Sequence, residues 1–198
     1  MSKDKDRDAI LAAGQEVFAR QGVDQTTLED IAKEAKLDLK KVKALFPDTQ
    51  SVLDEIIQRE LDETSELFTK VVSDRGKADI KLTCLVRDLL TRYQKGFSLF
   101  HLVSNCMEHA TQDDELIKCR VKPEHLDRYR QNTAILGRLI AQGQSENLFT
   151  DVDPLEAAYL LRGMIRSALL YRRVAKREDD MRDQADVVMR IFLKGLLR

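Results

Sequence analysis

Four lysines lie close together in the amino-terminal part of the chain: Lys36, Lys40, Lys41 and Lys43. The same stretch holds one acidic residue, Asp38, so it is strongly basic within a chain whose formal net charge is only −1. Ammonium groups at this density can neutralise phosphates, and the counterions released from a nucleic acid supply most of its non-specific affinity. A charge run is also often just the solvated face of a helix. The stretch therefore predicts either a phosphate-binding patch or an exposed face without a ligand.

A short helix is expected to carry these lysines. The apolar residues of the stretch recur at helical spacing and fall on one side: Leu39, Val42, Leu45 and Phe46. Asp38 can cap this helix, and Pro47 prevents its simple continuation because proline lacks an N–H and clashes with the preceding turn. Lys40, Lys41 and Lys43 then lie on the side that faces solvent.

Two helices are expected before it. The first has an apolar stripe over residues 10–18 and ends at Gly22. The second begins with a capping box in which the Thr26 hydroxyl and the Glu29 side chain satisfy the first backbone N–H groups. A tight turn at residues 36–37 joins it to the lysine-bearing helix. Two short helices joined in this way are typical of a helix-turn-helix that enters the major groove.

The composition favours an all-α fold. Of the 198 residues, 43% are hydrophobic and 34% charged, with only 8 glycines and 3 prolines, which suits long amphipathic helices. A long fourth helix is expected to begin near Thr49, and further helical patterns cover residues 78–94, 97–110, 115–119, 123–142, 154–176 and 180–197. We expect about nine helices, with a three-helix DNA-binding domain at residues 1–47 and a larger effector-binding and dimerisation domain at residues 48–198.

The chain is expected to be cytoplasmic and to have no membrane partner. Its charged amino terminus lacks the apolar core of a secretory signal, and no apolar run approaches the ~20 residues that span a bilayer. Three cysteines, an odd number, argue against a disulfide framework: Cys84, Cys106 and Cys119.

Many amino-terminal residues keep a recognisable order and spacing: Ile10, Leu11, Ala13, Phe18, Gly22, Thr26, Thr27, Asp30, Ile31, Ala32, Ala35, Leu37, Val42 and Phe46. This pattern resembles the TetR (tetracycline-repressor-like) family of bacterial transcriptional regulators. A second, downstream set resembles the loop and helix that open the family's dimerisation region: Gly143, Leu148, Phe149, Asp151, Val152, Asp153, Pro154, Ala157, Ala158 and Gly163. The closing run 191–196 is also similar to the family.

The resemblance implies that Thr27, Lys41 and Lys43 contact a DNA operator and that Lys40 faces the groove. With the neighbouring positions, the candidate DNA-binding residues are Thr26, Thr27, Lys36, Lys40, Lys41, Lys43 and Thr49. The chain departs from the family pattern at several of these positions. Lys36 and Lys40 replace glycines, Lys43 replaces an aromatic residue and Thr49 replaces a lysine. Next to them, Leu45 replaces an aromatic residue or a histidine. A left-handed backbone at Lys36 would be costly for a residue with a Cβ.

The middle helices are expected to surround an apolar pocket for a small molecule of unknown identity. The candidate ligand-binding residues are Tyr93, Phe97, His101, Cys106, Met107 and Tyr129, although such side chains usually only fill a core. The last two helices have broad apolar surfaces, which favour a homodimer over a monomer core. The candidate interface residues are Leu155, Tyr159, Ile165, Leu169, Val188 and Phe192.

No enzymatic motif is present. We find no phosphate-cradling glycine loop, no G-x-S-x-G elbow and no H-E-x-x-H helix, so we expect no enzyme and no cofactor. His101, Cys106, Glu108 and His109 match no strong zinc signature, so no metal is expected.

Two hypotheses follow. The first is a ligand-responsive regulator, a dimeric repressor that a small-molecule effector releases from a palindromic DNA operator. The alternative is a helical ligand-binding or partner-binding module that has lost specific DNA recognition, which the departures at Lys36, Lys40, Leu45 and Thr49 favour. Salt-sensitive, sequence-selective DNA binding separates the two.

Overall fold

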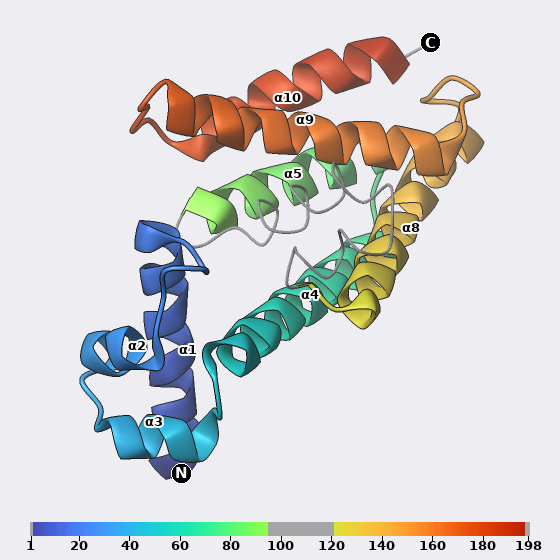
Figure 1. Cartoon of the computed structure of the whole chain (residues 1–198). Coiled ribbons are helices and arrows are strands. Elements are labelled where there is room, and N and C mark those ends of the chain that lie inside the picture. Colours follow the sequence, from blue (N-terminus) through green and yellow to red (C-terminus); the bar gives the residue numbers. More distant parts are fainter. Residues whose placement is uncertain (1, 95–120, 197–198) are drawn as a thin grey trace. The chain divides into compact units, whose positions relative to one another are not determined.

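The computed structural model describes residues 2–94 and 121–196, and these residues form eight helices (Figure 1). The helices are α1 (Ser2–Gln21), α2 (Leu28–Ala35), α3 (Leu39–Leu45), α4 (Thr49–Ser73), α5 (Ala78–Gln94), α8 (Pro123–Ser145), α9 (Pro154–Val174) and α10 (Met181–Leu196). The all-helical class is confirmed, but the described ranges contain eight helices where about nine were predicted. The helices predicted at 97–110 and 115–119 lie outside the described residues. None of the described helices combines the length and apolar character that a membrane crossing requires.

The described residues fall into two compact units. The smaller comprises residues 2–60 with 121–125, and the larger comprises residues 61–94 with 126–196. Two helices, α4 and α8, contribute residues to both units. The predicted DNA-binding helices α1, α2 and α3 all belong to the smaller unit.

The smaller unit has an apolar core to which all four of its first helices contribute. Its fully buried side chains include Ile10, Val17, Phe18, Ile31, Val42, Phe46, Val52, Leu53, Ile56 and Ile57. Gly14 on α1 allows close approach to α4, because a Cβ there would come within 2.9 Å of Val52 Cγ1. Burial of these side chains, at about 1.5–3 kcal/mol each, fixes which face of each short helix points inward.

An ionic network also holds α1 against α4. The Arg7 guanidinium donates two hydrogen bonds to the Glu55 carboxylate, and Arg59 bridges Glu55 and Asp8. Arg7 lies in addition over the Phe46 ring, 4.8 Å from its centroid. The Arg7 guanidinium holds the pKa of Glu55 below its usual range. These contacts fix the end of α3 through Phe46, so they help to position the lysine-bearing helix.

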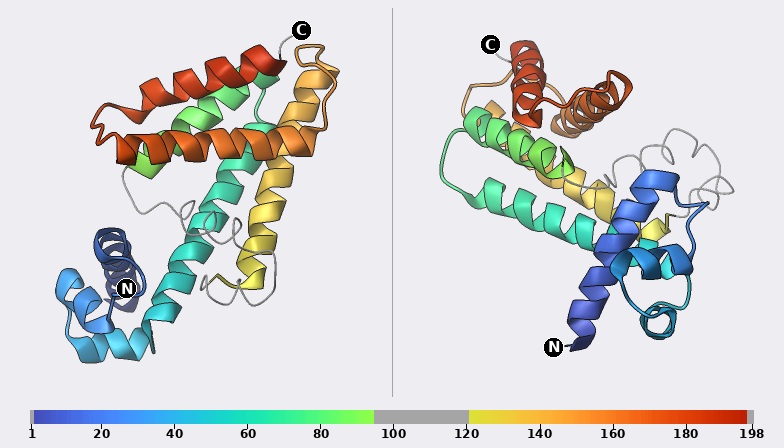
Figure 2. Two further views of the ribbon diagram at one scale, coloured as in Figure 1. Left: turned by 45° about the horizontal axis from the view of Figure 1, so that its top comes forward. Right: turned by 90° about the vertical axis from the view of Figure 1, so that its left-hand side faces the viewer.

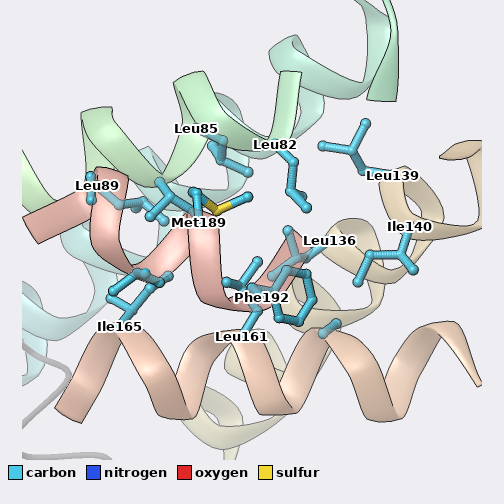
Figure 3. Close-up of a cluster of buried hydrophobic side chains, with 14 of the residues drawn as sticks. Leu82, Leu85, Leu89, Leu136, Leu139, Ile140, Leu161, Ile165, Met189 and Phe192 are labelled. Carbon is cyan, nitrogen blue, oxygen red and sulfur yellow. The ribbon is translucent and has the colours of Figure 1, made fainter. Parts of the chain in front are cut away.

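The larger unit is built around a second apolar core. Helices α5, α8, α9 and α10 contribute to it, as the close-up shows (Figure 3). Its labelled members are Leu82, Leu85, Leu89, Leu136, Leu139, Ile140, Leu161, Ile165, Met189 and Phe192. Helices α9 and α10 lie side by side, and α10 also packs along α5 (Figure 2).

A buried lysine closes the carboxyl end of α4 in this unit. The Lys81 ammonium donates to the carbonyl oxygens of Val72 and Asp74, at 2.8 and 2.9 Å, and to Gln142 Oε1 at 2.9 Å. The last carbonyls of a helix have no partner within the helix, so a cation there satisfies them and complements the helix dipole.

Candidate nucleic-acid interface

Helix α2 begins with a capping box one residue later than the sequence predicted. Thr27 is the N-cap: its hydroxyl accepts from Asp30 N at 3.2 Å, while the Asp30 carboxylate accepts from Thr27 N at 3.0 Å. The predicted pairing of Thr26 with Glu29 is therefore wrong. Thr26 is buried, and its hydroxyl donates to the Gly22 carbonyl at 2.7 Å because the chain turns there before the helix starts.

The ionised Asp30 carboxylate stabilises the start of α2. Hydrogen bonds from the Thr27 hydroxyl and backbone lower the pKa of Asp30 below its usual value, and Gln21 adds a further bond at 3.3 Å. A negative charge in the first turn also suits the helix dipole. Asp30 therefore fixes the amino end of α2, on which the orientation of the following turn and α3 depends.

The turn between α2 and α3 has a left-handed residue at Lys36, with φ 56° and ψ 38°. Leu37 N donates to Ala32 O at 3.0 Å, so the turn closes α2 in the way that usually requires glycine. The strained conformation that the sequence flagged as costly is therefore present. The Lys36 side chain remains exposed.

Replacing Lys36 by Gly is expected to raise the free energy of unfolding by about 1 kcal/mol, because the Cβ that clashes in the left-handed region is removed. Urea denaturation measures the change. The control is Lys36→Ala, which removes the same charge but keeps the Cβ and should not stabilise. Equal stability of the Gly and Ala variants would contradict the strain.

Helix α3 presents its lysines to solvent and its apolar side to the core. Val42 and Phe46 are 0% and 1% exposed, whereas Lys40, Lys41, Lys43 and Ala44 are exposed. The prediction that Asp38 caps the helix is confirmed, because its carboxylate accepts from Lys40 N at 2.7 Å. The seven residues of α3 thus form a short helix with a cationic outer face.

One of these lysines has an intramolecular partner. Lys43 Nζ lies 3.5 Å from Glu29 Oε1 on α2, and both side chains are more than half exposed. An exposed pair of this kind is worth at most about 1 kcal/mol, so a phosphate can displace it. In the part of the chain that the structure describes, the side chains of Lys36, Lys40 and Lys41 form no ion pair. Thr49 opens α4 and is half-buried, while Asp48 caps that helix by accepting from Ser51 N at 2.7 Å.

Only part of the predicted effector pocket lies within the described residues. Tyr93 is half-buried against the core of the larger unit, and Tyr129 is buried. Four further candidates lie outside the described residues: Phe97, His101, Cys106 and Met107. The described residues therefore do not test whether the six predicted effector contacts lie together.

A buried arginine beside Tyr129 escaped the sequence analysis. Arg162 on α9 is only 6% exposed, and its guanidinium lies 3.7 Å from the Tyr129 ring centroid. Its Nη1 donates to Thr133 Oγ1 at 3.0 Å. The signal that could have revealed it is a cationic residue in the middle of an otherwise apolar helix face. The interior of the larger unit therefore contains a charged group among aromatic and hydroxyl neighbours.

The predicted dimer residues divide into two groups. Leu155 and Tyr159 are exposed, whereas four others are buried in the chain's own core: Ile165, Leu169, Val188 and Phe192. These four pack between helices of one chain because their helix faces already have neighbours, so we revise the proposed interface below. Other large apolar side chains of α9 and α10 are exposed: Leu160, Leu170, Tyr171, Val174 and Ile191. Glycines lie on both helices, Gly163 and Gly195, with open space beside them.

Potential metal ligands do not gather in the described residues. Within residues 2–94 and 121–196, no group of three or more His, Cys, Asp or Glu side chains could hold a metal ion. His101, Cys106, Glu108 and His109 lie outside those ranges.

A helix-turn-helix formed by α2 and α3, with a cationic second helix and with α1 packed against α2, defines the amino-terminal region as a DNA-binding domain of the transcription-factor type. Residues 10–56 match the family model described as bacterial regulatory proteins, tetR family. The predicted resemblance to the TetR family is confirmed over these residues. No curated protein matches the chain.

Solved structures share the fold over nearly the whole chain. The transcriptional regulator FadR from Bacillus subtilis, solved in complex with stearoyl-CoA, is 19% identical with a TM-score of 0.74, covering 94% of this chain and 97% of its own. The fatty acid degradation regulator FadR from Bacillus halodurans is 20% identical with a TM-score of 0.74, covering 96% and 99%. A TetR/AcrR-family regulator from Thermobifida fusca is 22% identical with a TM-score of 0.64, covering 97% and 98%. At these identities the likeness concerns the fold.

Proposed function

We propose that the chain is a dimeric, ligand-responsive transcriptional repressor that works in the cytoplasm and not as an enzyme. Residues 1–47 bind a palindromic operator, and residues 48–198 bind a small-molecule effector and a second copy of the chain. The observation that carries this proposal is the face of α3, where exposed lysines lie opposite the buried Val42 and Phe46. The match of residues 10–56 to the TetR family supports it.

The DNA-binding residues are proposed to be Thr27, Lys36, Lys40, Lys41, Lys43 and Thr49. Their basic side chains supply positive charge for the DNA in a chain of net charge −1, so binding is local to this face. We no longer include the Thr26 side chain, because it is buried and donates to Gly22.

The effector is proposed to be a largely apolar small molecule that binds within residues 48–198. Tyr93 and Tyr129, with Phe97, His101, Cys106 and Met107, are the proposed contacts. The buried Arg162 beside Tyr129 indicates that the interior accommodates polar groups as well as apolar ones. Similarity of fold to a regulator solved with stearoyl-CoA supports a ligand with a long apolar part.

The dimer is proposed to form through the exposed apolar side chains of α9 and α10. Leu155, Leu170 and Val174 on α9 and Ile191 on α10 leave apolar surface that a soluble monomer rarely exposes. Gly163 and Gly195 allow helices of a second copy to approach closely. Two-fold pairing would bury both faces and set two α3 helices about 34 Å apart, one turn of DNA.

Replacing Ile191 by Glu is expected to make the chain monomeric at micromolar concentration, because an unpaired carboxylate in an apolar interface costs several kcal/mol. Analytical ultracentrifugation measures the change. Ile80 on α5 provides a matched control, since it is 60% exposed against 59% for Ile191. If Ile80→Glu dissociates the dimer and Ile191→Glu does not, the proposed interface is misplaced.

The proposed function is tested by adding DNA from upstream of the gene to the purified full-length chain. Selective binding that weakens steeply with salt is expected, with release on addition of the effector. Equal affinity for upstream and unrelated DNA would instead favour a ligand-binding or partner-binding module without operator recognition. The internal pairing of Lys43 with Glu29 is the observation that favours this second candidate.

A further inference from the structure

We infer that Lys40 and Ala44 are the two base-reading residues and that each operator half-site places a guanine within about two base steps of a thymine. This inference rests on the proposed operator binding and specifies which sequence is bound. It follows from the directions in which the side chains of α3 point and from the donors and acceptors that remain available there.

The buried residues of α3 define its inward direction. Val42 is 0% exposed, and each residue turns a helix by about 100°. Lys40 precedes Val42 by two residues and Ala44 follows it by two, so both lie on the opposite side of the helix. Both are exposed. They share one outward stripe because they are four residues apart, about 6 Å along the axis.

Lys41 and Lys43 lie on the two flanks of this stripe. Each is adjacent to Val42, so each points about 100° away from the inward direction, on opposite sides. A helix in the major groove has base edges in front of it and a phosphate backbone along each flank. Lys41 and Lys43 are therefore phosphate contacts, which position the helix without reading sequence.

The hydroxyl groups at the start of α2 are already engaged within the protein. Thr26 Oγ1 donates to Gly22 O at 2.7 Å, and Thr27 Oγ1 donates to Asp30 Oδ2 at 2.7 Å. Neither hydroxyl hydrogen is available for a base. This leaves the outward stripe of α3 to discriminate between base pairs.

The chemistry of that stripe selects the bases. A lysine has three donors and no acceptor. Guanine offers two neighbouring acceptors in the major groove, N7 and O6, whereas adenine places a donor beside its N7 and cytosine presents a donor. The Lys40 ammonium is thus matched by guanine. The Ala44 methyl group has no polar atom and is matched by the thymine C5-methyl group. Two base steps, about 6.8 Å, agree with the spacing of the two residues.

The test selects binding sites for the full-length chain from a library of random duplexes. The recovered half-site is then rebuilt with 7-deazaguanine, which lacks the N7 acceptor, or with inosine, which keeps N7 and O6 and alters only the minor-groove edge. We expect 7-deazaguanine to weaken binding about tenfold per half-site and inosine to leave it nearly unchanged. Uracil in place of thymine should weaken binding by a smaller factor, because only a methyl contact is lost.

Two exposed variants complete the test. Lys40→Ala should remove the guanine preference from the selected sequences, whereas Lys41→Ala should keep the same sequence and weaken every duplex alike, with a shallower salt dependence. If Lys40→Ala selects the wild-type sequence, or if 7-deazaguanine is tolerated, the inference is overturned while operator binding stands. Absence of selective binding by the wild-type chain overturns the proposed function itself.

Discussion

Replacing Lys40, Lys41 and Lys43 together by alanine is expected to lower the affinity for operator DNA by about a hundredfold or more near 0.15 M salt. Of the three, Lys41 and Lys43 are the proposed phosphate contacts and Lys40 contacts a base. Each phosphate contact contributes about 0.9 to the slope of log affinity against log salt, and a dimer loses the contacts of Lys41 and Lys43 twice. The slope should therefore become shallower by several units. Fluorescence anisotropy over a series of salt concentrations measures both quantities.

The control for this variant removes the same charge elsewhere. Lys70, Arg75 and Lys77 are exposed and lie in the larger unit, so their replacement by alanine changes the net charge equally. That control should keep nearly the full salt slope. Equal losses in the two triple variants would mean that net charge, and not the face of α3, drives binding. None of the three lysines on α3 is buried, so unfolding cannot account for the loss.

Replacing Gly143 by Ala is expected to lower the free energy of unfolding by about 2 kcal/mol or more. Gly143 lies near the carboxyl end of α8, and the chain returns over it after the left-handed Asn147, with φ 58°. A Cβ at position 143 would overlap the ring of Phe149, which is 0% exposed and enclosed by the core of the larger unit. The buried ring has little room to retreat, so the helix or the ring must shift.

Gly163→Ala is the matched control, because Gly163 is also within a helix but a Cβ there meets nothing within 4 Å. It should be neutral or raise the free energy of unfolding by up to about 1 kcal/mol, the gain in helix propensity. Thermal unfolding at two protein concentrations separates this effect from any change in the proposed dimer, which includes Gly163. If both glycine variants have the same stability, Phe149 does not constrain position 143.

The fold followed from the sequence where local chemistry decides the structure. The spacing of Val42 and Phe46, the cap at Asp38 and the break at Pro47 act within a few residues, and α3 has the predicted position and inward face. Gly143 and Phe149, which belong to the downstream set of family-like residues, are packed together, and the absence of a side chain at Gly143 leaves space for the Phe149 ring. The capping box shifted from Thr26 to Thr27 because two adjacent threonines compete for the same role, and the preceding turn uses the Thr26 hydroxyl.

Contacts between distant segments could not be predicted in the same way. Periodicity marked Ile165, Leu169, Val188 and Phe192 as apolar, but it does not tell a core within one chain from an interface between two. The pairing of Arg7 with Glu55 and the place of Arg162 beside Tyr129 depend on how helices pack, and no local spacing encodes that. The left-handed backbone conformation of Lys36 is likewise unfavourable in free energy, and the favourable contacts in the rest of the domain compensate for it.

The proximity of Glu29 to Lys43 has a consequence for how many mobile ions a duplex exchanges with this protein. The Lys43 ammonium already has the Glu29 carboxylate 3.5 Å away. A DNA phosphate oxygen that binds Lys43 therefore replaces this carboxylate as the partner of the ammonium. Fewer sodium ions should then leave the DNA at Lys43 than at Lys41. The ion stoichiometry of the complex will accordingly fall short of the number of cationic side chains that α3 offers.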